Sequence, residues 1–154
     1  MIVVSDTSSV TALIQVGKAD LLQKLYGEIL IPQAVRDELL KSHASLPQFL
    51  NCQSVARQSD VNRLMAELDR GEAEAIILAK ERHADALLID ELNGRAVARR
   101  EGVSVIGLLG VLVQAKQGKF LGSVRDLVKE LERVADFHLS EEIKMVAFRK
   151  AGEI

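Results

Sequence analysis

The chain has 154 residues, of which 48% are hydrophobic and 3% aromatic, so it can form a packed core and is not an intrinsically disordered chain. Its 20 basic and 22 acidic residues give a formal net charge of -2, which excludes nucleic-acid binding through overall basic charge. Cys52 is the only cysteine, which excludes an internal disulfide. Since we find neither a membrane-length apolar run nor a signal-peptide pattern, we expect a soluble cytoplasmic protein with one domain over residues 1–154.

The chain up to about residue 80 alternates short apolar runs, typical of buried strands, with segments whose apolar residues recur at helical spacing. In chain order the expected elements are a strand at 1–4, a helix from Ser8, a helix at 18–27, a strand at 28–31, a helix opened by Pro32, a loop at 42–48, an edge strand at 52–56, a helix from Ser59, an interruption at Gly71 and a helix at 72–79. The proline suits the first helical turn, where its missing N–H costs nothing.

The same alternation continues to about residue 120 and then gives way to helices alone. The expected elements are a strand at 86–89, a helix at 93–100, a strand at 103–106 and helices at 108–116, 124–134 and 140–148. This order predicts an α/β fold in which helices cover a parallel sheet of 4–5 strands. We expect residues 1–120 to form the α/β core and residues 121–154 to form a helical extension of the same domain.

Acidic residues follow two of the expected strands. Asp6 comes directly after the first strand, and Asp90 with Glu91 follows the strand at 86–89. If these strands are parallel neighbours, the acids lie at the carboxyl edge of the sheet, where α/β folds bind ligands. Glu38 and Glu72 lie on expected helices, where a solvated face explains Glu38 and a favourable helix N-terminus explains Glu72; taken singly, each of these acids is more often structural. If these carboxylates converge, they need a cation such as Mg²⁺ or Mn²⁺ to offset their repulsion.

An ordered set of short motifs runs through these same positions. The motifs are Ser5-Asp6-Thr7-Ser8, Ile31-Pro32, Val35-Arg36-Asp37-Glu38-Leu39, Gly71-Glu72-Ala73-Glu74-Ala75-Ile76, Leu87-Leu88-Ile89-Asp90-Glu91, Gly94-Arg95 and Val105-Ile106-Gly107. In order and spacing they resemble the PIN domain, and more narrowly the uncharacterised PIN-like proteins of bacteria and archaea. The resemblance covers about residues 1–120 and implies a three-layer α/β/α fold.

The resemblance also implies a set of site residues. It makes Asp6, Glu38, Glu72 and Asp90 the catalytic and metal-binding acids, holding Mg²⁺ or Mn²⁺. The supporting or alternative residues are Ser8 beside the first acid, Glu74 in place of Glu72, Glu91 in place of Asp90, and Arg95 as a phosphate contact or a surface ion-pair partner. Glu72 and Glu74 differ by about 200° of helical rotation, so both cannot face one site from a regular helix.

The implied activity is that of a metal-dependent endoribonuclease that hydrolyses RNA, as the toxin component of a toxin–antitoxin module. Glu stands where the family usually has Asp at the third acid, which leaves open a catalytically weak or inactive PIN-like module that acts through protein partners. A haloacid-dehalogenase-type phosphatase would need an acid at position 8, where this chain has Ser8. The glycines form no nucleotide-binding fingerprint.

The resemblance further implies a homodimer and an antitoxin protein as partners. The apolar stripe of the helices from Val124 to Phe148 either packs on its own domain or buries itself against a second chain. If the stripe is the dimer contact, Leu131→Asp should give a soluble monomer.

Overall fold

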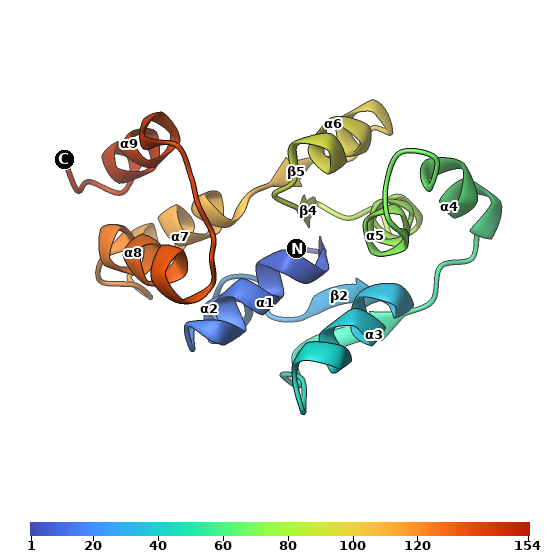
Figure 1. Ribbon diagram of the computed structural model, residues 1–154, viewed down its shortest axis with the longest axis horizontal. Helices are drawn as coiled ribbons and strands as arrows, with labels where there is room; N and C mark the ends of the chain where they lie inside the picture. Colours follow the sequence, from blue (N-terminus) through green and yellow to red (C-terminus); the bar gives the residue numbers. More distant parts are fainter.

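The computed structural model describes residues 1–154 as a five-stranded parallel sheet with nine helices (Figure 1). The strands are β1 (Val3–Ser5), β2 (Ile29–Pro32), β3 (Leu50–Gln53), β4 (Ala86–Leu88) and β5 (Val105–Ile106). Their order in the sheet is β3-β2-β1-β4-β5, and every neighbouring pair is parallel. The expected α/β fold with a parallel sheet of 4–5 strands is therefore confirmed.

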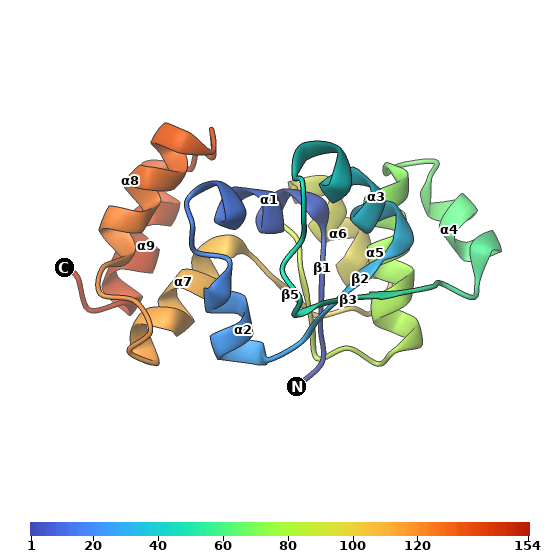
Figure 2. The same cartoon turned by 90° about the horizontal axis from the view of Figure 1, so that it is seen from below.

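Helices cover both faces of the sheet, as the three-layer expectation requires. The helices are α1 (Thr7–Gln15), α2 (Asp20–Tyr26), α3 (Gln33–Ser42), α4 (Gln58–Leu64), α5 (Arg70–Glu81), α6 (Leu92–Arg100), α7 (Leu108–Gln117), α8 (Val124–Val134) and α9 (Glu141–Lys150). Figure 2 shows α2, α7, α8 and α9 on one side of the strands and α4 and α5 on the other.

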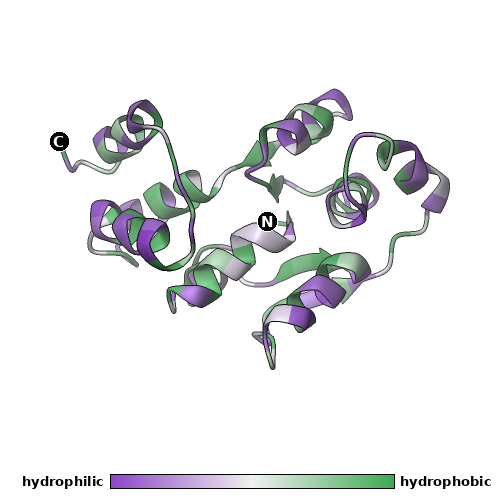
Figure 3. Cartoon of the chain, viewed as in Figure 1, coloured by the Kyte–Doolittle hydropathy of each residue, from purple (hydrophilic) through white to green (hydrophobic).

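Two hydrophobic clusters hold these layers together. Successive side chains of a strand point to opposite faces, so Val3 belongs to the cluster beneath α1, α2, α7, α8 and α9, whereas Val4 belongs to the cluster beneath α4, α5 and α6. Leu88 and Leu87 of β4 divide in the same way. Figure 3 shows hydrophobic residues concentrated in the strands and hydrophilic ones along the helices of the periphery. Both faces of the central strands are thus buried, which explains their continuous apolar runs.

Several expected boundaries were wrong. The edge strand lies at 50–53 instead of 52–56, because β3 pairs with β2 from Leu50 onward. Strand β5 covers only residues 105–106 of the expected 103–106. Gly71 does not interrupt the chain but lies inside α5, since the Asp69 side chain caps that helix and lets it begin at Arg70.

The C-terminal helices pack most of their apolar stripe against their own chain and leave Val134, Ile143 and Val146 exposed. Val124, Leu127 and Leu131 of α8 lie in the same buried cluster as Val3 and α1, and Leu131 is 0% exposed. Leu131→Asp would place a charge in this core and unfold the chain, so it cannot separate a dimer as expected above. None of the nine helices has the length and apolar character needed to cross a membrane.

Candidate active site

The site begins where the neighbouring parallel strands β1 and β4 end. Asp6 follows β1 directly, is 3% exposed, and caps the first turn of α1. Its Oδ1 accepts a hydrogen bond from the Ser9 backbone N–H at 3.2 Å, and its Oδ2 accepts one from the Ser8 hydroxyl at 3.2 Å. These contacts fix the direction of a buried carboxylate at the carboxyl edge of the sheet.

Asp90, after β4, is tied to Asp6 through Ser9. The Ser9 hydroxyl donates to Asp90 Oδ2 at 2.8 Å, while the backbone N–H of Leu108 donates to Asp90 Oδ1 at 3.0 Å. Asp90 therefore caps the start of α7 as well as standing beside Asp6. Arg95 donates from Nη1 to the Ile89 carbonyl at 3.0 Å, which anchors its guanidinium at the end of the same strand.

A cavity of about 350 Å³ opens beside Asp6, between α1, α3 and α5. No hydrophobic residue lines it; its walls carry five carboxylates and four hydroxyls, from Asp6, Thr7, Ser8, Thr11, Glu38, Ser42, Asp69, Glu72 and Glu91. We call this space the acidic cavity. It brings together residues that are up to 85 positions apart in the chain, from Asp6 to Glu91.

Two glycines bring the longer acids close to the backbone of the cavity wall. The Glu38 Oε1 atom lies 2.5 Å from the place where a Cβ of residue 71 would stand, so any side chain there would displace the carboxylate. The Glu72 Oε2 atom lies 3.0 Å from the corresponding position at Gly94. Because Gly71 and Gly94 have no side chain, they leave room for the Glu38 and Glu72 carboxylates.

The carboxylates of the acidic cavity lack cationic partners. Burial is the main cause that raises the pKa of Asp6; the nearby charge of Asp90 acts in the same direction, its hydrogen bonds to Ser9 and Ser8 act against it, and the resulting pKa is about 6. Burial, followed by the charge of Asp69, raises the pKa of Glu72 to about 7. Burial likewise raises the pKa of Asp90. Such shifts mean that the folded chain resists collecting this negative charge unless a cation offsets it.

The structure separates the residues expected from sequence into two groups. Asp6, Ser8, Glu38, Glu72 and Glu91 line the acidic cavity. The others lie outside the lining: Asp90 behind Asp6, Arg95 at the strand end, and Glu74 on another face of α5, where it contacts the first turn of α3.

Sequence reasoning missed four lining residues, namely Thr7, Thr11, Ser42 and Asp69. Only Asp69 carried a usable signal. An Asp three residues before a Glu at the start of an apolar helical pattern indicates a helix N-cap, and the Asp69 Oδ1 does accept the Glu72 N–H at 2.8 Å. The hydroxyl residues had no distinguishing spacing.

The donor atoms of the acidic cavity suit a hard divalent cation. Carboxylate and hydroxyl oxygens are the ligands that Mg²⁺ and Mn²⁺ prefer, and no cysteine or histidine lines the space. As placed, no three acidic side chains are close enough to ligate one ion together, so binding requires rotation of the flexible glutamates. The site therefore fits such an ion by its chemistry and its uncompensated charge.

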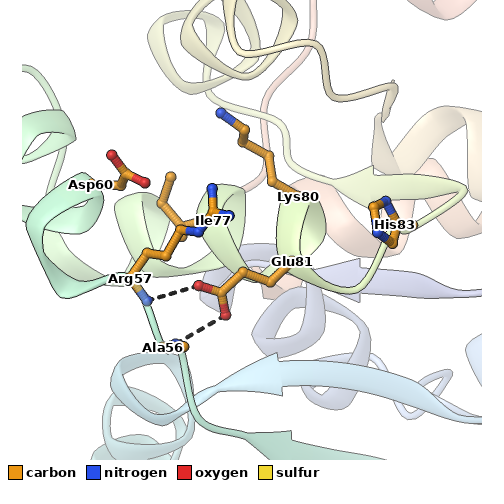
Figure 4. A pocket seen from close by; sticks show the side chains of 7 residues that line it. All are labelled: Ala56, Arg57, Asp60, Ile77, Lys80, Glu81 and His83. Atoms are coloured by element: carbon orange, nitrogen blue, oxygen red, sulfur yellow. Dashed lines mark hydrogen bonds between the residues drawn. The ribbon is translucent and has the colours of Figure 1, made fainter.

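A second cavity of about 350 Å³ lies at the other end of α5 (Figure 4). There the Glu81 carboxylate accepts the backbone N–H groups of Ala56 and Arg57 at 2.9 and 2.8 Å. Lys80 and Arg57 stand beside it, so this cavity has cations of its own. It lacks the unpaired carboxylates that distinguish the acidic cavity.

Comparison with known proteins gives one result. The family model described as "DUF3368: PIN domain" matches residues 2–153, which is nearly the whole chain. No curated protein and no solved structure matches the chain.

Proposed function

This chain belongs to the PIN-domain family DUF3368, and from that premise we propose that it is a Mg²⁺- or Mn²⁺-dependent endoribonuclease. The observation that carries the proposal is the acidic cavity, in which five carboxylates face one space without a paired cation. RNA carries a phosphate charge at every nucleotide, so an acidic cavity can accept it only through bridging cations. The absence of apolar or aromatic lining favours contact with the sugar-phosphate backbone over base stacking.

The ions would be held by Asp6, Glu38 and Glu72, with Asp90 behind Asp6 and Glu91 at the cavity wall. When bound, they supply activation of water and stabilisation of charge at the phosphodiester. Ser8 and the Ser9 N–H hold the Asp6 carboxylate in a single orientation, which a ligand needs because Mg²⁺ tolerates little error in geometry. Arg95, held at the strand end by its hydrogen bond to the Ile89 carbonyl, is the cation that we propose contacts a phosphate.

The proposal extends to partners. We propose a role as the toxin of a toxin–antitoxin pair, with a homodimer as the assembly and an antitoxin protein as inhibitor. Since α8 buries Val124, Leu127 and Leu131 internally, the exposed Val134, Ile143 and Val146 are the large apolar side chains of α8 and α9 left for such a contact.

The experiment is calorimetric titration with Mn²⁺ of the wild type and of Asp6→Asn, with cleavage of a mixed RNA pool measured alongside. Asn keeps an oxygen acceptor for the Ser9 N–H, so the fold should survive. We expect saturable binding and cleavage in the wild type, and loss of both by roughly 100-fold or more in Asp6→Asn.

Asp85→Asn is the matched control. Asp85 accepts the Ile2 N–H at 2.6 Å at the amino-terminal ends of β1 and β4, away from the acidic cavity. Its substitution should therefore leave metal binding and cleavage intact. If the folded wild type binds no Mn²⁺ and cleaves no RNA, the nuclease proposal fails. The alternative from the sequence, a non-catalytic PIN-like module that acts through protein partners, would then replace it.

A further inference from the structure

Glu74 is a buried acid that the mechanism above does not use. Its side chain is on α5 and only 6% exposed, yet it does not line the acidic cavity. Its Oε1 instead accepts the backbone N–H of Ala34 at 3.0 Å. Arg70 Nη1 lies 3.7 Å from its other oxygen, which offsets part of the charge.

The Ala34 N–H belongs to the first turn of α3, whose donors have no partner within the helix. Most helices satisfy such a donor with the side chain of their own N-cap residue. Helix α3 cannot, because its N-cap is Pro32 and makes no side-chain hydrogen bond. Glu74 therefore supplies from α5 the cap that α3 lacks, and its negative charge also suits the positive end of the α3 dipole.

The same two helices meet again at the acidic cavity. Glu38 lies one turn after Ala34 on α3, and its carboxylate approaches Gly71, which lies about one turn before Glu74 on α5. The two contacts show that α3 and α5 pack antiparallel to each other. A shift of the first turn of α3 would be transmitted directly to Glu38, because a helix moves as a rigid unit over one turn.

We propose that Glu74 is a positioning residue for the acidic cavity: by capping α3 from α5, it fixes Glu38 opposite Glu72. This inference rests on the proposed function, since it assigns Glu74 a role in metal binding without contact with the metal. It also explains how two glutamates two residues apart on α5 serve one site. Glu72 faces the cavity, and Glu74, rotated by about 200°, holds the helix that brings the opposing acid.

Glu81 provides a matched control within the same helix. It too is an α5 glutamate that accepts backbone N–H groups of a neighbouring segment, but at the end remote from the acidic cavity (Figure 4). Removing either carboxylate should lower stability. Only Glu74 should alter the metal site.

The test measures Mn²⁺ affinity by calorimetry and the thermal midpoint for the wild type, Glu74→Ala, Glu74→Gln and Glu81→Ala. We expect Glu74→Ala to weaken Mn²⁺ binding by about tenfold, a size typical of lost outer contacts around metal ligands. Glu74→Gln should restore affinity, because its amide oxygen can still accept the Ala34 N–H. Glu81→Ala should lower the thermal midpoint and leave affinity unchanged.

Three results would separate the outcomes. Absence of Mn²⁺ binding by the folded wild type overturns the proposed function, and the present inference with it. Wild-type affinity in Glu74→Ala, or equal losses in Glu74→Ala and Glu81→Ala, overturns the positioning role alone. If Glu74→Ala does not fold, Glu74→Asp replaces it, because the side chain shortened by one methylene loses reach to Ala34; unchanged affinity in that variant also overturns the role.

Discussion

The carboxylates beside the two ends of α5 differ in whether they have cationic partners. Beside its last turn, Glu101 accepts hydrogen bonds from Arg63 at 2.9 and 3.1 Å and from Lys80 at 3.0 Å. These contacts, with the Arg63 hydrogen bonds first, lower the pKa of Glu101 to about 2. Beside its first turn, Asp6 and Glu72 have no such partner, and their pKa values rise to about 6 and 7.

This contrast separates acids that are paired within the fold from acids for which we propose a bound cation. A paired carboxylate at one end stabilises the folded chain by itself. Unpaired carboxylates at the other end lower the stability of the folded chain once they ionise. Such unpaired buried acids are typical of functional sites, where a bound ligand can offset their charge. The difference lies in the neighbours of each acid, and the following experiments alter those neighbours or the charge itself.

The largest expected effect is on stability as a function of pH without metal. The unfolded chain releases the Asp6 proton near pH 3.8, whereas the folded chain keeps it to about pH 6. Between these values the folded state holds more protons, so stability falls as the pH rises, by about 3 kcal/mol for Asp6. Glu72 adds a fall in the same direction up to about pH 7. Chemical denaturation from pH 4 to 8 measures this decline.

Two comparisons check its cause. Saturating Mn²⁺ should restore the lost stability at pH 8 and have little effect at pH 4, where protons occupy the carboxylates. Asp6→Asn should flatten the decline, since it removes the group that titrates. Below pH 4 the sign reverses at the far end of α5, because the pKa of Glu101 is lowered and its contribution is lost as the pH falls towards 2. A metal-free stability that rises steadily from pH 4 to 8 would contradict the contrast.

A second experiment makes the same change at both ends. Glu72→Gln removes one carboxylate from the acidic cavity and should weaken Mn²⁺ binding by roughly 30-fold, about 2 kcal/mol, without lowering metal-free stability at pH 8. Glu101→Gln breaks a carboxylate's bonds to Arg63 and Lys80 and should lower the thermal midpoint by a few degrees while leaving affinity intact. If both variants lose stability and neither loses affinity, the two ends do not differ as described.

The parts of the fold visible in the sequence were those with a strong local pattern. The buried strands are continuous apolar runs, because both faces of the sheet are covered, and Asp6 and Asp90 stand directly after two of them. Their adjacency then followed from parallel pairing of β1 with β4. Strand boundaries were less predictable, since pairing with a neighbour and not the local sequence sets where β3 and β5 begin.

The features that could not be predicted from the sequence are those that depend on contacts between distant residues. Nothing local distinguishes an apolar stripe that packs inward from one that binds another chain, so the burial of Leu131 became clear only from the structure. The role that we propose for Glu74 likewise depends on its hydrogen bond with Ala34, 40 residues away. The assignment of catalytic acids stays a prediction, although the structure places Glu91 and not Asp90 on the wall of the acidic cavity.

The smallest effect concerns Asp69, which both caps α5 and adds charge to the acidic cavity. Asp69→Ser keeps a capping oxygen but removes the charge, whereas Asp69→Ala removes both and should cost about 1 kcal/mol of folding stability. Since the Asp69 charge raises the pKa of Glu72, Asp69→Ser should move the Glu72 titration to lower pH, as followed by side-chain NMR. Mn²⁺ affinity should change little in either variant. A loss as large as that of Glu72→Gln would make Asp69 a metal ligand, and the third acid of the site would then be the N-cap of α5 instead of Glu72.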